Sequence, residues 1–95
     1  MRRAAKKDTC HRPITNALRQ AGCTVIDLSA LGNGAPDAIV FKGDRIRLHE
    51  YKSKYGQFTP DQIKWQHNHP DIMQYYRKIK SVGEAFEDMR IEFKP

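Results

Sequence analysis

Residues 34–52 read Gly-Ala-Pro-Asp-Ala-Ile-Val-Phe-Lys-Gly-Asp-Arg-Ile-Arg-Leu-His-Glu-Tyr-Lys, two apolar runs separated by the dipeptide Gly43-Asp44. Gly-Asp is typical of a two-residue hairpin turn. A turn at this dipeptide pairs Lys42 with Arg45, and the antiparallel ladder then continues away from the turn on both sides. The segment therefore predicts a β-hairpin, and the neighbouring elements are expected to assemble around it.

The open end of this hairpin is expected to gather three ionisable side chains. Continuing the ladder sets Asp37 opposite Glu50, and the alternation of side chains along a strand puts Lys52 on the face of Glu50. Opposed Cβ atoms lie about 4.5–5.5 Å apart, so two carboxylates there repel each other unless positive charge lies between them. Lys52 and a divalent cation, Mg²⁺ or Mn²⁺, would supply that charge.

A structural interpretation competes with this site. Asp37 could serve only to cap a turn, and Glu-x-Lys is a common, weakly specific pattern. The pairing register favours a site, because it places these charges on the face that carries four apolar hairpin residues, Ile39, Phe41, Ile46 and Leu48. We expect this face to point toward the core, where charge is costly unless it serves a purpose.

Composition limits the class of protein. A chain of 95 residues predicts one domain, residues 1–95. Its net charge of +6 indicates a polyanionic partner, although many small proteins are basic for solubility alone. No apolar run approaches the roughly 20 residues of a membrane span, and no signal peptide is apparent. We expect no membrane association and a cytoplasmic location.

The remaining elements follow from periodicity and cap residues. We expect helices over residues 13–21, 59–69 and 82–89, and strands over residues 23–28 and 74–80. Thr59 with Gln62, and Ser81 with Glu84, predict capping boxes. The order is α-β-β-β-α-β-α, which predicts an α/β fold with a small mixed sheet flanked by helices.

The cysteines indicate no disulfide framework. A zinc site built from Cys10, His11, His67 and His69 has spacings that match no common zinc finger. Cys23 is expected to be a small buried side chain at the start of a strand.

Three segments together resemble the PD-(D/E)xK nuclease superfamily: Gly34–Asp37, Glu50–Lys52, and Phe58–Gln62 with Trp65. They are most similar to its stand-alone VRR-NUC type from phages and bacteria, and the resemblance covers residues 8–89. It implies a restriction-endonuclease-like αβββαβ core and a metal-dependent DNA endonuclease. Such stand-alone members are similar to Holliday-junction resolvases, which act on branched DNA as homodimers.

The resemblance also implies roles for individual residues. Asp37, Glu50 and the backbone carbonyl of Tyr51 would bind Mg²⁺ or Mn²⁺, Lys52 would hold the nucleophilic water, and Gln62 would face the site. Relatives often carry a supporting glutamate in the first helix, whereas this chain offers Asp8 or His11 in that region.

Several basic residues are expected to contact DNA phosphates, with solvated side chains as the alternative: Arg2, Arg3, Lys6 and Lys7 in a basic arm over residues 1–7, and Lys54 and Lys64 near the site. We expect Phe58, Ile63 and Trp65 to be core residues rather than base-stacking platforms. His67 and His69 are expected to be exposed at a helix end.

Two rival functions remain open at this point. The chain could be a non-catalytic nucleic-acid-binding module, with Asp37 and Glu50 as structural charges, and it would then bind DNA without a metal. It could instead be an interaction partner within a larger repair or replication assembly.

Overall fold

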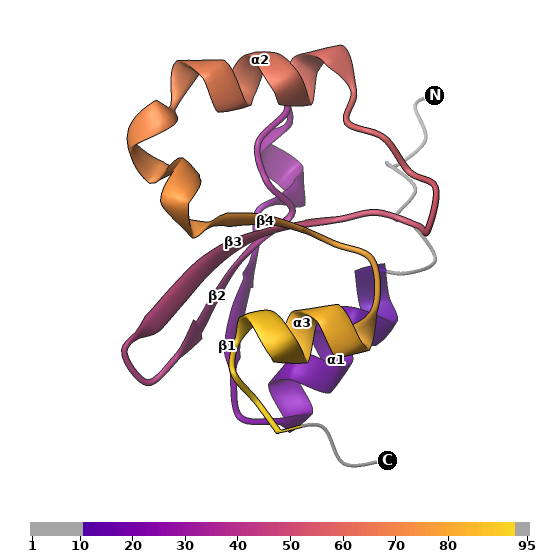
Figure 1. Cartoon of the computed structure of the whole chain (residues 1–95), viewed down its shortest axis with the longest axis vertical. Helices are drawn as coiled ribbons and strands as arrows, with labels where there is room; N and C mark the ends of the chain where they lie inside the picture. The colour runs from indigo at the N-terminus through magenta and orange to yellow at the C-terminus, as the bar shows by residue number, and fades with distance from the viewer. Residues whose placement is uncertain (1–10, 93–95) are drawn as a thin grey trace.

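The computed structural model describes residues 11–92, in which helices flank one four-stranded sheet (Figure 1). The elements, in chain order, are α1 (His11–Gln20), β1 (Thr24–Asp27), the 3₁₀ turn η1 (Ser29–Leu31), β2 (Ala38–Lys42), β3 (Arg45–Tyr51), α2 (Pro60–Asn68), the 3₁₀ turn η2 (Pro70–Tyr75), β4 (Tyr76–Ile79) and α3 (Val82–Asp88). The predicted order and the α/β class are confirmed.

The sheet has the order β1-β2-β3-β4, with the first three strands antiparallel and β4 parallel to β3. The hairpin register is the predicted one, with Lys42 opposite Arg45 and Ile39 opposite Leu48. Gly43 takes a φ of +59° in the turn, which suits a residue without Cβ. Parallel neighbours need a crossover, and the segment containing α2 and η2 supplies it.

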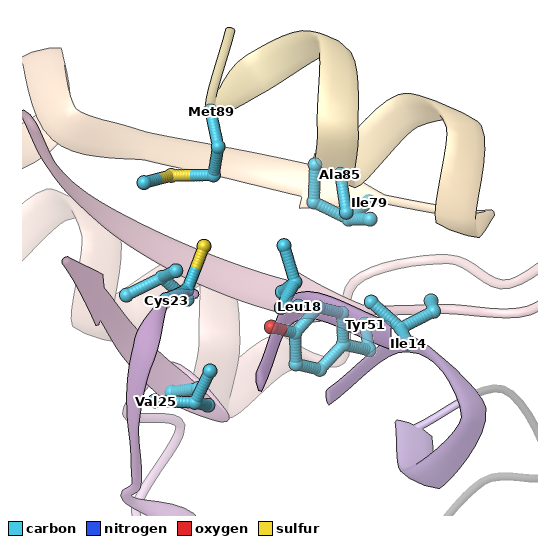
Figure 2. Packing of buried hydrophobic residues seen from close by; sticks show 10 residues of the cluster. Ile14, Leu18, Cys23, Val25, Tyr51, Ile79, Ala85 and Met89 are labelled. Carbon is cyan, nitrogen blue, oxygen red and sulfur yellow. The ribbon is translucent and has the colours of Figure 1, made fainter. Parts of the chain in front are cut away.

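The hydrophobic core lies on one face of this sheet, beneath α1 and α3. Figure 2 shows this cluster, whose buried members are Ile14, Leu18, Cys23, Val25, Ala38, Val40, Tyr51, Ile79, Ala85 and Met89. Ile14 and Leu18 are four residues apart on α1, so both side chains reach the sheet. Cys23 is buried just before β1, as expected, and burial raises the pKa of its thiol.

The opposite face of the hairpin is not the core, which corrects our expectation. Ile39, Phe41 and Leu48 are half-buried there and Ile46 is exposed. Alternation shows that two faces differ, but it does not show which one the helices cover. Here the helices α1 and α3 cover the face of Ala38 and Val40, and α2 lies over only part of the other face.

A carboxylate on α3 explains how polar residues can occupy the core face. Asp88, which is 3% exposed, accepts a hydrogen bond from Arg47 Nε at 2.8 Å and one from Arg77 Nη1 at 3.3 Å. His49 Nε2 lies 2.9 Å from the same carboxylate, and His49 Nδ1 lies 3.2 Å from the Tyr51 hydroxyl. These contacts fasten α3 to β3 and β4 and satisfy buried polar groups.

Three smaller expectations were wrong. β4 begins at Tyr76 rather than residue 74, because Pro70 starts the η2 turn. Ser81 Oγ accepts from the Glu84 amide at 3.1 Å, but the Glu84 carboxylate accepts from the amide of Lys80 rather than from that of Ser81. The residues of the second helix and its approach, Phe58, Ile63 and Trp65, do not belong to the buried core.

Across residues 11–92, no helix has the length and apolar character needed to cross a membrane.

Candidate active site

Asp37 lies one residue before β2 and is held by the main chain of β3. Its amide donates to the carbonyl oxygen of His49 at 3.0 Å, which extends the hairpin ladder. Its carboxylate Oδ2 accepts from the amide of Tyr51 at 2.8 Å. Both hydrogen bonds fix this carboxylate at the end of β3, next to Glu50.

Glu50 is almost completely buried, at 2% exposure, and is the centre of the site. Its Oε2 accepts from Gln62 Nε2 at 2.7 Å and lies 3.8 Å from Lys52 Nζ. Its Oε1 is buried and accepts no hydrogen bond from a donor within residues 11–92, although the protonated Glu50 side chain hydrogen-bonds to Asp37. A buried polar atom without a partner is rare and costs stability, so this oxygen is suited to an added ligand.

When both carboxylates are ionised, the site holds more negative charge than Lys52 neutralises. Burial, the charge of Asp37 and a side-chain hydrogen bond to Asp37 raise the pKa of Glu50 to about 8, while Lys52 and the Gln62 hydrogen bond act in the opposite direction. One lysine therefore does not balance the two carboxylates. An additional cation would stabilise the ionised form of Glu50.

Gln62 connects the beginning of α2 to the carboxylates. Its side-chain Oε1 accepts from the Thr59 amide at 2.9 Å, and its own amide donates to Thr59 Oγ1 at 3.2 Å. These two bonds form the predicted capping box, with Pro60 in the first turn of the helix. The same side chain thus caps α2 and, through its other amide atom, orients Glu50.

Two residues of β4 also reach this face, and the sequence analysis did not assign them to the site. Lys78 is paired with Glu50 in the parallel register, and its Nζ lies 4.9 Å from the centroid of the Phe58 ring. Burial, and then the charge of Glu50, raise the pKa of Tyr76. The register between β3 and β4 crosses a long connection, so no local sequence signal reveals these neighbours.

The chemistry of the site suits a hard divalent cation. Asp37 and Glu50 supply carboxylate oxygens, the ligands that Mg²⁺ and Mn²⁺ prefer. No cluster of three or more His, Cys, Asp or Glu side chains with metal-ligand geometry occurs in the described part of the chain. A cation here would complete its shell with main-chain oxygen, water or substrate, as Mg²⁺ commonly does.

The other predicted residues lie elsewhere. His11 is buried against the ring of Tyr51, at 5.1 Å between centroids, and lies 4.0 Å from Asp27. Tyr51 and Glu50 are successive residues of β3, so His11 is on the far side of the sheet from Glu50. Asp8 and Cys10 lie outside the described residues. So do the four residues of the basic arm, which are Arg2, Arg3, Lys6 and Lys7.

Lys54 and Lys64 are exposed. Lys54 Nζ lies 5.4 Å from the Tyr55 ring centroid. His67 is exposed as expected, but His69 is half-buried and stacks on Trp65 at 4.2 Å between centroids, which corrects its assignment as an exposed residue.

The sequence matches no model of a known protein family, and neither curated proteins nor solved structures gave a match.

Proposed function

We propose that this chain is a metal-dependent DNA endonuclease of the PD-(D/E)xK superfamily, VRR-NUC type, acting on branched DNA such as Holliday junctions. The observation that carries the proposal is the environment of Glu50. This buried carboxylate has an oxygen that accepts no hydrogen bond from a donor and a raised pKa, and it interacts with both Asp37 and Lys52. The three side chains occur in the order that the resemblance implies, at the open end of the β2–β3 hairpin.

Each residue has a distinct part in the proposed reaction. When bound, Mg²⁺ or Mn²⁺ supplies an acidified water and positive charge at the phosphate. Asp37, Glu50 and the Tyr51 carbonyl would hold this ion. Lys52 orients the attacking water or neutralises charge that develops on the phosphate. Gln62 keeps Glu50 in position through the 2.7 Å hydrogen bond.

Basic charge supports DNA as the substrate. The net charge of +6 favours contact with a phosphate backbone. Lys54 and Lys64 are exposed near α2, and the basic arm adds four cations in residues 1–7. A domain of 95 residues has little surface for reading base sequence, so we propose recognition of DNA shape and backbone.

The proposal includes a homodimer, because two sites would cut opposing strands at a branch. An apolar hollow of about 380 Å³ on the open sheet face supports self-association; it is lined by Ile39, Phe41, Ile46, Leu48, Ile72 and Tyr75. Sedimentation equilibrium is expected to give twice the mass of one chain. The mass of a single chain at micromolar concentration would contradict the dimer.

Metal removal tests the function directly. Purified protein is expected to cut a four-way junction and a flap in Mg²⁺ or Mn²⁺, and to leave them intact in EDTA, because Glu50 and Asp37 cannot activate water alone. Linear duplex of the same sequence serves as the substrate control. Cleavage in EDTA would contradict a metal-dependent reaction, and salt-sensitive binding without cleavage under all three conditions would favour the non-catalytic module.

A further inference from the structure

A polar hollow lies beside α2, next to the proposed active site. It measures about 320 Å³, and its lining comes from the loop before β2 and from one side of the helix: Asn33, Asp61, Lys64, Trp65 and Asn68. The four helical residues follow the i, i+3, i+4, i+7 spacing, so they share one face of α2. The volume falls within the range of small-molecule pockets, about 300–1,000 Å³.

The same two segments, the loop before β2 and the helix α2, contribute to both the hollow and the carboxylate site. Gly34 has a φ of +83°, and a Cβ at this position would collide with the main-chain carbonyl of Asp61, so a glycine is required for the loop to reach α2. Figure 1 shows the connection that contains η1 running up to α2. Gln62, the next residue of the helix, donates to Glu50. A ligand in the hollow would therefore lie close to the site.

The lining selects against simple ions. The Asp61 carboxylate disfavours a free anion and the Lys64 ammonium disfavours a free cation. Trp65 contributes aromatic surface to the lining, and its ring lies against His69 at 4.2 Å and Tyr76 at 6.1 Å between centroids. His69 Nδ1 also donates to the Trp65 carbonyl oxygen at 2.7 Å. This combination suits a planar ring that is attached to a phosphate.

The polar groups of the lining suit the edge of a nucleobase. Asn33 and Asn68 each offer an amide donor and a carbonyl acceptor, the pattern that base edges pair with. Asp61 accepts from exocyclic amino groups, and Lys64 suits the adjoining phosphate. Base–aromatic contact adds affinity that depends little on sequence.

We propose that this hollow binds one unpaired nucleobase of the DNA substrate, beside the phosphate to be cut. The inference rests on the proposed nuclease function and names its substrate class. Bases within a continuous duplex are paired and stacked, so a base enters the hollow only where a strand is unpaired. Flaps, single-stranded ends and branches whose base pairs open at the crossover are therefore preferred over continuous duplex.

Trp65 is the chain's single tryptophan, so its fluorescence reports directly on the hollow. The full chain is titrated in EDTA with a short single strand, with an abasic strand of equal length, and with continuous duplex. The base-bearing strand is expected to quench Trp65, and the other two to bind with little quenching. Asn68→Ala is expected to weaken binding of the base-bearing strand about fivefold, which corresponds to the contribution of one hydrogen bond. Binding of the abasic strand is expected to stay unchanged.

Asn16→Ala is the matched control, because Asn16 is an exposed asparagine on α1, across the sheet from α2. It is expected to bind all three ligands as the wild type does. Equal quenching by the base-bearing and abasic strands, or by duplex, would overturn the base site. Cleavage in Mg²⁺ without base-dependent quenching would overturn this inference alone. Base-dependent quenching by a protein that cleaves no DNA would overturn the nuclease and support the base site.

Discussion

Glu50→Gln is expected to reduce cleavage of branched DNA by at least about two orders of magnitude, because metal ligation contributes several kcal/mol to the transition state. Glutamine has nearly the same shape and keeps a carbonyl acceptor for the Gln62 amide, 2.7 Å away in the wild type. It cannot supply the negative charge that binds a cation. Single-turnover cleavage in saturating Mg²⁺ measures the loss, and DNA binding in EDTA is expected to persist.

The same substitution is expected to stabilise the metal-free protein at pH 8. The pKa of Glu50 is about 8 in the folded state against an ordinary value of 4.5, so the folded state binds more protons between these values. The free energy of unfolding of the wild type therefore falls as pH rises from 4.5 to 8. Glu50→Gln removes this contribution, and its unfolding midpoint in urea is expected to exceed that of the wild type most clearly at pH 8.

Mg²⁺ separates the catalytic from the structural interpretation. Adding Mg²⁺ at pH 8 is expected to stabilise the wild type, because a ligand of the folded state shifts the unfolding equilibrium, and to leave Glu50→Gln unchanged. Glu87→Gln, at an exposed position on α3, is the control and should retain cleavage and the Mg²⁺ response. Lys52→Met should lose cleavage as well. Full activity in Glu50→Gln would refute the proposed active site.

The hairpin was predictable because its information is local. Gly43-Asp44 fixes the turn, the turn fixes the register, and the register sets Asp37 beside Glu50. The capping box at Thr59 is equally local, and it places Gln62 in the first turn of α2. Sequence reasoning therefore located the residues of the candidate site that lie on or near one hairpin.

The burial of the two sheet faces was not predictable in this way. Along Arg45–His49 the apolar residues alternate with basic ones, which suggests that the basic face meets solvent. The structure has His49 fully buried and Ile46 exposed, because Asp88, more than forty positions from Arg45, neutralises the basic face. Such a long-range pairing leaves no periodic signal. The position of Lys78 beside Glu50 was not predictable for the same reason, because it depends on the β4 crossover.

Asp88→Ala is expected to destabilise the fold more than other single changes of α3. Arg47, Arg77 and His49 all contact this carboxylate, and Arg45 Nε donates to its main-chain oxygen at 2.6 Å. Removing one partner of a buried ion pair leaves uncompensated charge and costs about 3–5 kcal/mol. The total free energy of unfolding of a protein is about 5–15 kcal/mol. The midpoint of urea unfolding should therefore fall to a much lower urea concentration. Glu87→Ala, the exposed neighbour, should unfold as the wild type does.

Acid titration distinguishes the charge of Asp88 from its packing. Burial would raise the pKa of Asp88, but hydrogen bonds from His49 and Arg47 and their positive charge outweigh burial and hold it at about 2, below the ordinary 3.8. The stabilisation is therefore complete above pH 3.8 and is lost as pH falls toward 2. The stability gap between the wild type and Asp88→Asn should narrow over this range. A stability difference between the wild type and Asp88→Asn that does not change with pH would assign the effect to packing. Glu50 acts only between pH 4.5 and 8, so Asp88→Asn should flatten the acidic side of the plot of unfolding free energy against pH, and Glu50→Gln the basic side.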